Sequence, residues 1–232
     1  MFSSNQLKIV FLAGALFASA CGFWQDKPDA AASPPFVAAE LKSTIPFSSK
    51  EPDSYQTEIV VTANNAEDRT FAARDKEKRL IIFNFQAESE IGVLQLGAGQ
   101  SFLIAANQKI YAENEKGGRS ENTSDFFAAE WLSQKTDARF ETLPAENNLV
   151  RYRVSLDETK NSEIIVFVDT QIALPVRQEF YSVKDGEKRL NLTMELRNFS
   201  AQPDAKLFEV PKDFRKVSLK EFRQAAHRGQ VK

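Results

Sequence analysis

Residue types that commonly do chemistry are scarce in this chain. Cysteine and histidine occur once each, as Cys21 and His227, near opposite ends of the sequence. A nucleophilic triad, a Cys/His pair or a zinc site needs several such side chains together, so the sequence predicts none of these sites. Carboxylates are plentiful, and those in loop-like stretches include Glu113, Glu115, Glu121, Asp157 and Glu158. Their charge-mixed surroundings are typical of solvated surface, although a hydrolase with two catalytic acids stays open. We therefore expect no enzyme, no metal and no cofactor.

The residues around Cys21 indicate that its thiol is an acylation site. Lys8 precedes an apolar run, Ile9–Ala20, which is too short to span a bilayer and fits the core of a secretory signal. Ala18-Ser19-Ala20-Cys21 resembles a bacterial lipobox, in which the cysteine is acylated and becomes the new N-terminus. This resemblance implies a lipid-anchored envelope protein, and Gly22 is compatible with an outer-membrane position facing the periplasm. The alternative is an ordinary secretory signal with an incidental thiol.

The composition beyond the signal describes a globular body that is tethered and does not span the membrane. About 210 residues remain, which is enough for one domain. Hydrophobic residues make up 42% of the chain, and the 19 phenylalanines predict a strongly apolar interior. A formal net charge of −2 gives no basic field for nucleic acid. We expect a signal peptide at 1–20, an acylated tether with a short helix at 21–53, and a folded domain at 54–232.

Alternation of apolar and polar residues predicts a mainly β domain. Leu190, Leu192, Met194 and Leu196 alternate with polar residues, and a period of two recurs along the chain from Tyr55 onward. Turn signals such as Asn64-Asn65 and Asp185-Gly186 separate the strands, and the second predicts a tight hairpin that joins 177–183 to 188–199. One apolar and one polar side on each strand favours a curved antiparallel sheet, wet on its outer face, that forms an incomplete β-barrel.

Helical patterns interrupt the strands. Ser124–Gln134 places Phe127 and Trp131 on one helical stripe behind a serine cap. Ser218-Leu219-Lys220-Glu221 matches a capping box and predicts a C-terminal helix. A further short helix is expected at Phe36–Leu41. These helices are expected to cover the sheet.

Motifs in the C-terminal third resemble, in order, the LolA/LolB superfamily of envelope lipoprotein carriers. They are Val168-Asp169-Thr170, Leu174-Pro175-Val176-Arg177-Gln178-Glu179, Leu196-Arg197-Asn198-Phe199 and Leu207-Phe208-Glu209-Val210-Pro211. The resemblance covers Tyr55 to Val217 and implies a LolA-like half-barrel around helices, with an apolar concavity that accepts acyl chains. A soluble carrier of this family lacks a lipid anchor, so its membrane-held receptor is the nearer analogue. No leucine-bearing insertion loop in this chain matches that receptor.

The cavity of such a half-barrel would be lined by apolar side chains from the inward strand faces and from the covering helix. The candidates are Phe83, Phe85, Leu94, Leu96, Phe102, Ile104, Phe127, Trp131, Val154, Val166, Leu192 and Met194. Each of them is also consistent with ordinary core packing. Phe127 and Trp131 could form a lid that the ligand displaces. Arg177 could hold a lipid head group or pair with Glu179 on the same strand face.

Two functions are compatible with these features. The first is an anchored periplasmic lipoprotein that binds acyl chains of lipids or lipoproteins, for lipoprotein localisation or lipid transfer. The alternative is a non-enzymatic envelope sensor or interaction protein that uses the same concave sheet without carrying lipid. The expected partners are acyl chains, the membrane through the anchor, and an envelope protein, with no nucleic acid.

Overall fold

The computed structural model describes residues 41–42, 44–88, 90–97, 99–114, 132, 135, 138–156 and 161–229. All of these residues belong to one unit, Ala39–Lys232. Cys21, Phe127 and Trp131 lie outside the described residues, as does the helix expected at 36–41 except for its last residue. That residue, Leu41, is in a strand.

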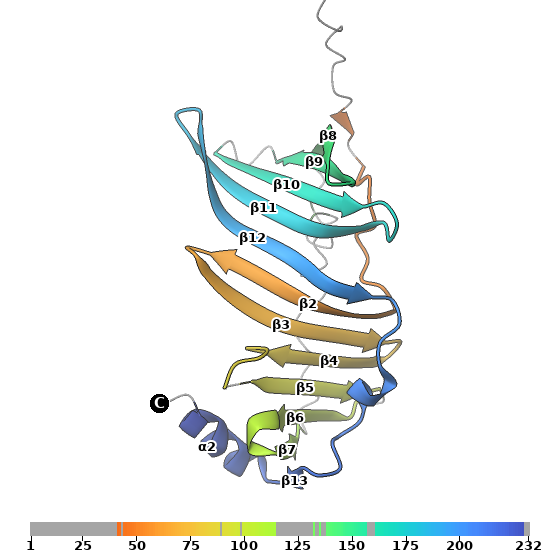
Figure 1. Cartoon of the computed structure of the whole chain (residues 1–232), viewed down its shortest axis with the longest axis vertical. Coiled ribbons are helices and arrows are strands. Elements are labelled where there is room, and N and C mark those ends of the chain that lie inside the picture. Colours follow the sequence, from red (N-terminus) through yellow and green to blue (C-terminus); the bar gives the residue numbers. More distant parts are fainter. Residues whose placement is uncertain are drawn as a thin grey trace, which may run out of the picture. The chain divides into compact units, whose positions relative to one another are not determined.

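Within the described residues, thirteen strands form one sheet (Figure 1). They are β1 (Leu41–Lys42), β2 (Ser54–Ala63), β3 (Ala66–Asp75), β4 (Lys78–Phe83), β5 (Ile91–Leu96), β6 (Ser101–Ala105), β7 (Ile110–Glu113), β8 (Arg139–Glu146), β9 (Leu149–Ser155), β10 (Ser162–Asp169), β11 (Leu174–Lys184), β12 (Glu187–Ser200) and β13 (Arg215–Lys216). Their order is β1-β8-β9-β10-β11-β12-β2-β3-β4-β5-β6-β7-β13. The sheet is open because its ends, β1 and β13, are different strands that each pair with one neighbour. The predicted mainly β, curved and unclosed antiparallel sheet is confirmed, and β13 adds one parallel pair with β7.

Tight turns connect the long strands where the sequence predicts them. Asn64 and Asn65 have φ angles of 51° and 64° between β2 and β3, and Asp185 and Gly186 have 53° and 84° between β11 and β12. Positive φ at both central residues is the geometry of the primed turn that suits a two-residue hairpin. The predicted hairpin at Asp185-Gly186 is therefore confirmed, with longer strands than expected.

Short helices follow the C-terminal strands. They are η3 (Ala205–Phe208) and α2 (Leu219–Gly229), and an earlier turn, η1 (Ala106–Gln108), connects β6 to β7. The Ser218 hydroxyl accepts a hydrogen bond from the Glu221 amide at 3.2 Å, which confirms one half of the predicted capping box. Within the helix expected at 124–134, Leu132 is described, and it is helical.

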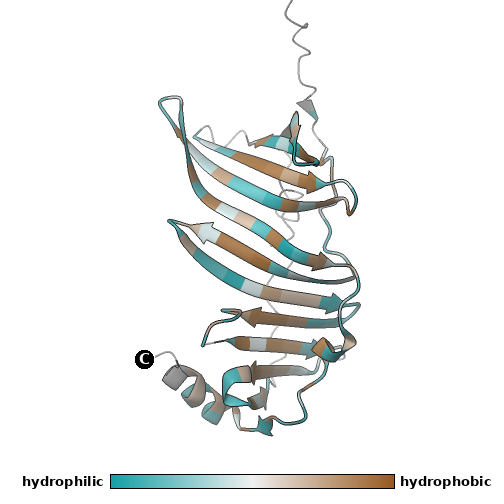
Figure 2. Ribbon diagram, viewed as in Figure 1, coloured by the Kyte–Doolittle hydropathy of each residue, from teal (hydrophilic) through white to brown (hydrophobic). Residues whose placement is uncertain are grey.

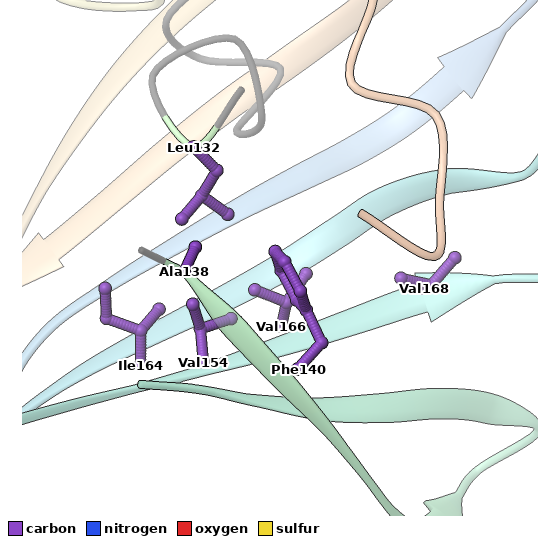
Figure 3. Packing of buried hydrophobic residues seen from close by; sticks show 7 residues of the cluster. All are labelled: Leu132, Ala138, Phe140, Val154, Ile164, Val166 and Val168. Atoms are coloured by element: carbon purple, nitrogen blue, oxygen red, sulfur yellow. The ribbon is translucent and has the colours of Figure 1, made fainter. Parts of the chain in front are cut away.

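One side of the sheet, here called the helix face, carries two covered clusters. Leu132 points toward the sheet and packs with Phe140 of β8, Val154 of β9 and Val166 of β10 (Figure 3). Phe222 of α2 packs with residues of β6 and β7, including Ala105 and Ala112. The strand registers place both clusters on the same side, because each residue pair across neighbouring strands shares a face.

The opposite side, here called the ion-pair face, was predicted to be exposed to solvent, but part of it is covered. Phe208 of η3 packs there on Leu80, Leu94 and Ile104 of β4, β5 and β6, so the C-terminal segment covers this part of the sheet. Figure 2 shows the result as hydrophobic residues along β4 and β5 and hydrophilic ones at the tip of the β11–β12 hairpin. Strands that are buried on both sides carry apolar residues at even and odd positions alike. A pattern of alternating apolar and polar residues therefore does not predict them.

Candidate functional site

A partly exposed row of apolar side chains lies on the helix face between the two covered clusters. It consists of Val61 of β2 and Leu192, Met194 and Leu196 of β12, and we call it the apolar band. Met194 is paired with Val61, and Leu196 with Ile59, so these side chains are neighbours across the two strands. Three members of the band, Val61, Met194 and Leu196, pack against a buried cluster that contains Tyr55, Ile59 and Ala72. The apolar band is thus a supported surface in the middle of the sheet.

The structure does not bring the predicted cavity candidates together on one face. Val154 and Val166 lie in the Leu132 cluster, and Leu192 and Met194 lie in the apolar band. Leu94, Leu96, Phe102 and Ile104 instead pack on the ion-pair face with Phe208. We therefore restrict the proposed ligand surface to the helix face.

The two phenylalanines of the β4 region differ in their surroundings. Phe83, at the end of β4 on the helix face, is 44% exposed. Phe85 lies beyond the end of β4 and packs on Phe71, with ring centroids 5.3 Å apart. Phe85 therefore does not share the face of Phe83, because the chain turns at Asn84, where φ is 50°.

A chain of ion pairs crosses the ion-pair face from β11 to β3. It runs through Glu179, Arg177, Glu195, Arg197, Glu67, Arg69 and Glu58. Arg177 pairs with Glu179, as the sequence predicts for two residues on one strand face, and its guanidinium lies 4.9 Å from the centre of the Phe167 ring. These contacts compensate the positive charge of Arg177 within the protein. A structural role is therefore favoured over binding of a lipid head group.

Tyr181 extends this network next to Glu179. Its hydroxyl donates a hydrogen bond to the Glu179 carboxylate at 2.5 Å. Burial, followed by this hydrogen bond, raises the pKa of Tyr181 to about 12. The tyrosine therefore stays neutral and acts as a donor over the physiological range.

A second set of charges is centred on Glu51, which is 6% exposed. Its carboxylate accepts from the Tyr55 hydroxyl at 2.7 Å, from Arg74 at 3.1 Å and from Arg79 at 2.5 Å. Burial, and then the Glu51 charge, raise the pKa of Tyr55. The cluster joins the segment before β2 to β2, β3 and β4, and its acid is fully engaged by donors.

A pocket of about 500 Å³ opens beside this cluster. It is bounded by the segment from Ser48 to Ser54, by Gln171, Ile172 and Leu174, and by Phe199 and Ala201 at the end of β12. Phe199 stacks on Tyr55, with ring centroids 6.3 Å apart. The lining mixes polar and apolar residues, and Glu51 within it is already paired with Arg74 and Arg79.

The described residues hold no group of three or more His, Cys, Asp or Glu side chains that could bind a metal ion. Among the same residues, no helix has the length and apolar character needed to cross a membrane.

Comparisons with known proteins find similar folds only among solved structures, since no family model and no curated protein matches the chain. The chain is similar to a chain of the MucA/MucB complex of Pseudomonas aeruginosa, with 13% identity and a TM-score of 0.42, over 72% of this chain and 58% of that chain. It thus spans less than two thirds of that chain's length.

Smaller solved proteins are similar over most of their own length. A LolA superfamily protein of Nitrosomonas europaea has 14% identity and a TM-score of 0.27, over 68% of this chain and 90% of that chain. A DUF1329 family protein of Desulfovibrio piger has 10% identity and a TM-score of 0.26, over 69% and 91%.

Two polar features of the helix face were not found by sequence reasoning. The Glu51 cluster unites residues from separate segments, and no spacing rule connects Glu51 with Arg74 or Arg79. Gln178 stands within the Leu174–Glu179 motif and is 3% exposed. The one available signal was a polar residue at a position whose neighbours in register, Val166 and Met194, are apolar.

Proposed function

We propose that this chain is a membrane-anchored lipoprotein of the bacterial envelope whose helix face binds acyl chains of lipids or lipoproteins. Acylation of Cys21 would hold it in the membrane, since a thioether-linked diacylglycerol and an amide-linked chain together anchor a protein stably. The carrying role is lipoprotein localisation or lipid transfer. The observation that supports binding is the apolar band, a partly exposed apolar surface between covered clusters on a sheet that is otherwise well packed.

The energetics favour a hydrocarbon ligand for this surface. Each methylene removed from water contributes about 0.8 kcal/mol, so a sixteen-carbon chain offers roughly 10 kcal/mol before the entropic costs of binding. Met194 suits such a ligand, because a flexible, polarisable side chain adapts to a chain of variable shape. The charges of the ion-pair chain on β11, β12, β2 and β3 lie on the opposite face, where they pair with one another.

Lipid bound to the purified protein tests this proposal. The full-length Cys21→Ser chain, which lacks the acylated thiol, is purified in a mild detergent and its lipids are identified by native mass spectrometry. We expect a lipid to copurify reproducibly with this chain when it carries no further substitution. Met194→Trp should abolish its uptake, because the indole fills the surface next to Val61. Leu190→Trp is the matched control, since Leu190 lies on the same strand, outside the apolar band, and is 47% exposed.

The outcomes separate the two functions. Loss of lipid in Met194→Trp with retention in Leu190→Trp supports carriage on the helix face. A stable wild-type fold that never binds lipid contradicts carriage and favours the envelope sensor or interaction protein. Equal uptake by both variants would move the lipid site elsewhere in the molecule.

A further inference from the structure

Gln178 of β11 is a buried amide in an apolar setting. Its side chain lies on the helix face between Val166 of β10, which is fully buried, and Met194 of β12. The residue is 3% exposed, and its carboxamide oxygen has no hydrogen-bond partner within the described part of the chain. Of the residues that the structure describes, the amide nitrogen reaches only the Met194 sulfur, at 3.8 Å, which is a weak contact.

An amide in this state is costly for the folded protein. A buried acceptor without a donor has lost its hydrogen bonds to water and has gained none in exchange. Nearly all buried polar atoms in folded proteins have partners, so one without a partner calls for a physical reason. Leucine or methionine would fill the same volume without this cost. The glutamine is therefore better suited to a state in which something donates to its oxygen.

The surroundings of Gln178 connect it to the apolar band. Met194, its cross-strand partner, is one of the partly exposed residues of the band. An unbranched methionine side chain changes rotamer easily, and its contact with the Gln178 nitrogen is weak enough to be replaced. Displacement of this one side chain would open the carboxamide to a molecule that lies along the band. The amide would then be the polar point of an otherwise apolar contact surface.

We propose that Gln178 accepts a hydrogen bond from an acyl ligand that carries a donor near its carbonyl end, either a hydroxyl group or an amide N–H. This inference rests on the proposed function, because it places the ligand on the apolar band. It narrows the ligand class from any hydrocarbon chain to hydroxylated or amide-linked acyl chains. The carboxamide oxygen provides the selectivity, and the band provides most of the affinity.

Neutral probes of equal chain length test this selectivity. Methyl palmitate has no donor, methyl 3-hydroxypalmitate has a hydroxyl, and N-methylpalmitamide has an amide N–H. Each is titrated into the full-length Cys21→Ser chain in a mild detergent, and occupancy is measured by native mass spectrometry. One added hydrogen bond predicts binding about 3- to 10-fold tighter than that of methyl palmitate. The probe that shows this gain identifies the donor.

Two variants locate the effect at Gln178. Gln178→Met keeps the side-chain volume and removes the acceptor, so the three probes should bind alike. Ser101→Ala is the matched control, because Ser101 is 5% exposed and its hydroxyl is also buried with no hydrogen-bond partner among the described residues, but it lies on β6. The control should keep the wild-type preference.

The possible failures are distinguishable. If the wild-type sequence binds all three probes equally, the role of Gln178 is wrong and acyl binding stands. A preference that survives in Gln178→Met places the acceptor elsewhere and also contradicts the inference. If none of the probes binds, the proposed function itself fails. The comparison of probes on the unaltered Gln178 needs no variant, so the test holds even if Gln178→Met does not fold.

Discussion

At the scale of single residues, two polar features of the helix face have opposite environments. Glu51 joins three donors in one place, and two of them are arginines on neighbouring strands. Removal of a carboxylate that is buried with its partners is strongly destabilising, because the partner charges are then left uncompensated. Gln178 presents the opposite case of a buried group whose acceptor is unused. The first is a structural feature, and the second is where we place ligand recognition.

Glu51→Gln should lower the free energy of unfolding by about 2 kcal/mol or more, because Arg74 and Arg79 would lose the buried counterion that they share, and Arg74 would keep only its pair with the exposed Asp53. Urea unfolding followed by circular dichroism measures this loss. Glu146→Gln removes an ion pair with Arg151 from a residue whose side chain is 44% exposed, and it should cost no more than about 1 kcal/mol. Equal losses in the two variants would contradict the structural role of the Glu51 cluster.

Two tyrosines with raised pKa values, Tyr55 and Tyr181, make stability sensitive to alkaline pH. Tyrosine in the unfolded chain loses its proton near its ordinary pKa of 10.0, whereas the pKa of folded Tyr181 is about 12. The folded state then holds more protons than the unfolded state, so stability falls as the pH rises from about 10 to about 12. The raised pKa of Tyr55 acts in the same direction.

Tyr181→Phe should therefore lose less stability than the wild type over this range. Urea midpoints at about pH 8 and about pH 11 measure the difference, and the pH 8 value corrects for the lost hydrogen bond to Glu179. An identical alkaline loss in both proteins would show that Tyr181 does not contribute.

At the scale of elements, the structure explains what one sequence motif of the C-terminal segment does. Phe208 stands in the Leu207–Pro211 motif that contributed to the family resemblance, and in the structure it anchors η3 on β4, β5 and β6. The exposed fraction of Phe208 is 4%. The segment continues to β13, where Arg215 and Lys216 pair with β7. Phe208, together with Leu207, Val210 and Phe214, thus holds the C-terminal segment on the ion-pair face.

Phe208→Ala should destabilise the protein by about 3 kcal/mol or more, because the side chain is large and fully packed. Thermal unfolding measures the loss, and hydrogen exchange should show faster opening of β4 and β5. Phe83→Ala is the matched control, since that ring is 44% exposed and should cost much less. Unchanged protection of β4 and β5 would contradict the anchoring role of Phe208.

The strands, turns and C-terminal helix were largely predictable from sequence. The side of the sheet on which each strand residue lies was not. Asn64-Asn65 and Asp185-Gly186 specify turns through local backbone geometry, and Ser218 specifies the start of α2, so these predictions needed only neighbouring residues. Leu94 and Met194 looked equivalent as members of apolar rows. They lie on opposite faces because both sides of the sheet carry apolar clusters, and strand pairing far along the chain decides the side. The Glu51 cluster depends on the same long-range pairing.

At the scale of the whole molecule, the proposal combines an anchor in the sequence with a binding surface in the fold. The lipobox resemblance and the apolar band are independent observations, from residues 18–21 and from β2 and β12. Each can fail without the other. An anchored protein without a lipid site would be an interaction protein, and a lipid site without an anchor would be a soluble carrier.

Cys21→Ser should abolish labelling of the protein by radioactive palmitate and leave the signal uncleaved, because a serine hydroxyl does not form the thioether. Gel electrophoresis and autoradiography of cell membranes measure both effects. Ser33→Ala, in the proline-rich tether, is the control and should be labelled as the wild type is. A wild-type protein without label would support the ordinary secretory signal instead.

The outermost strands of the sheet have a consequence for the behaviour of many copies together. β1 and β13 contain two residues each, and β8 extends beyond β1 through a stretch that includes Pro144, which has no backbone N–H. These short edges offer a second copy of the protein few unpaired backbone amide groups with which to extend the sheet. We therefore expect the protein to resist fibril growth and edge-to-edge polymerisation even where it is crowded on one surface.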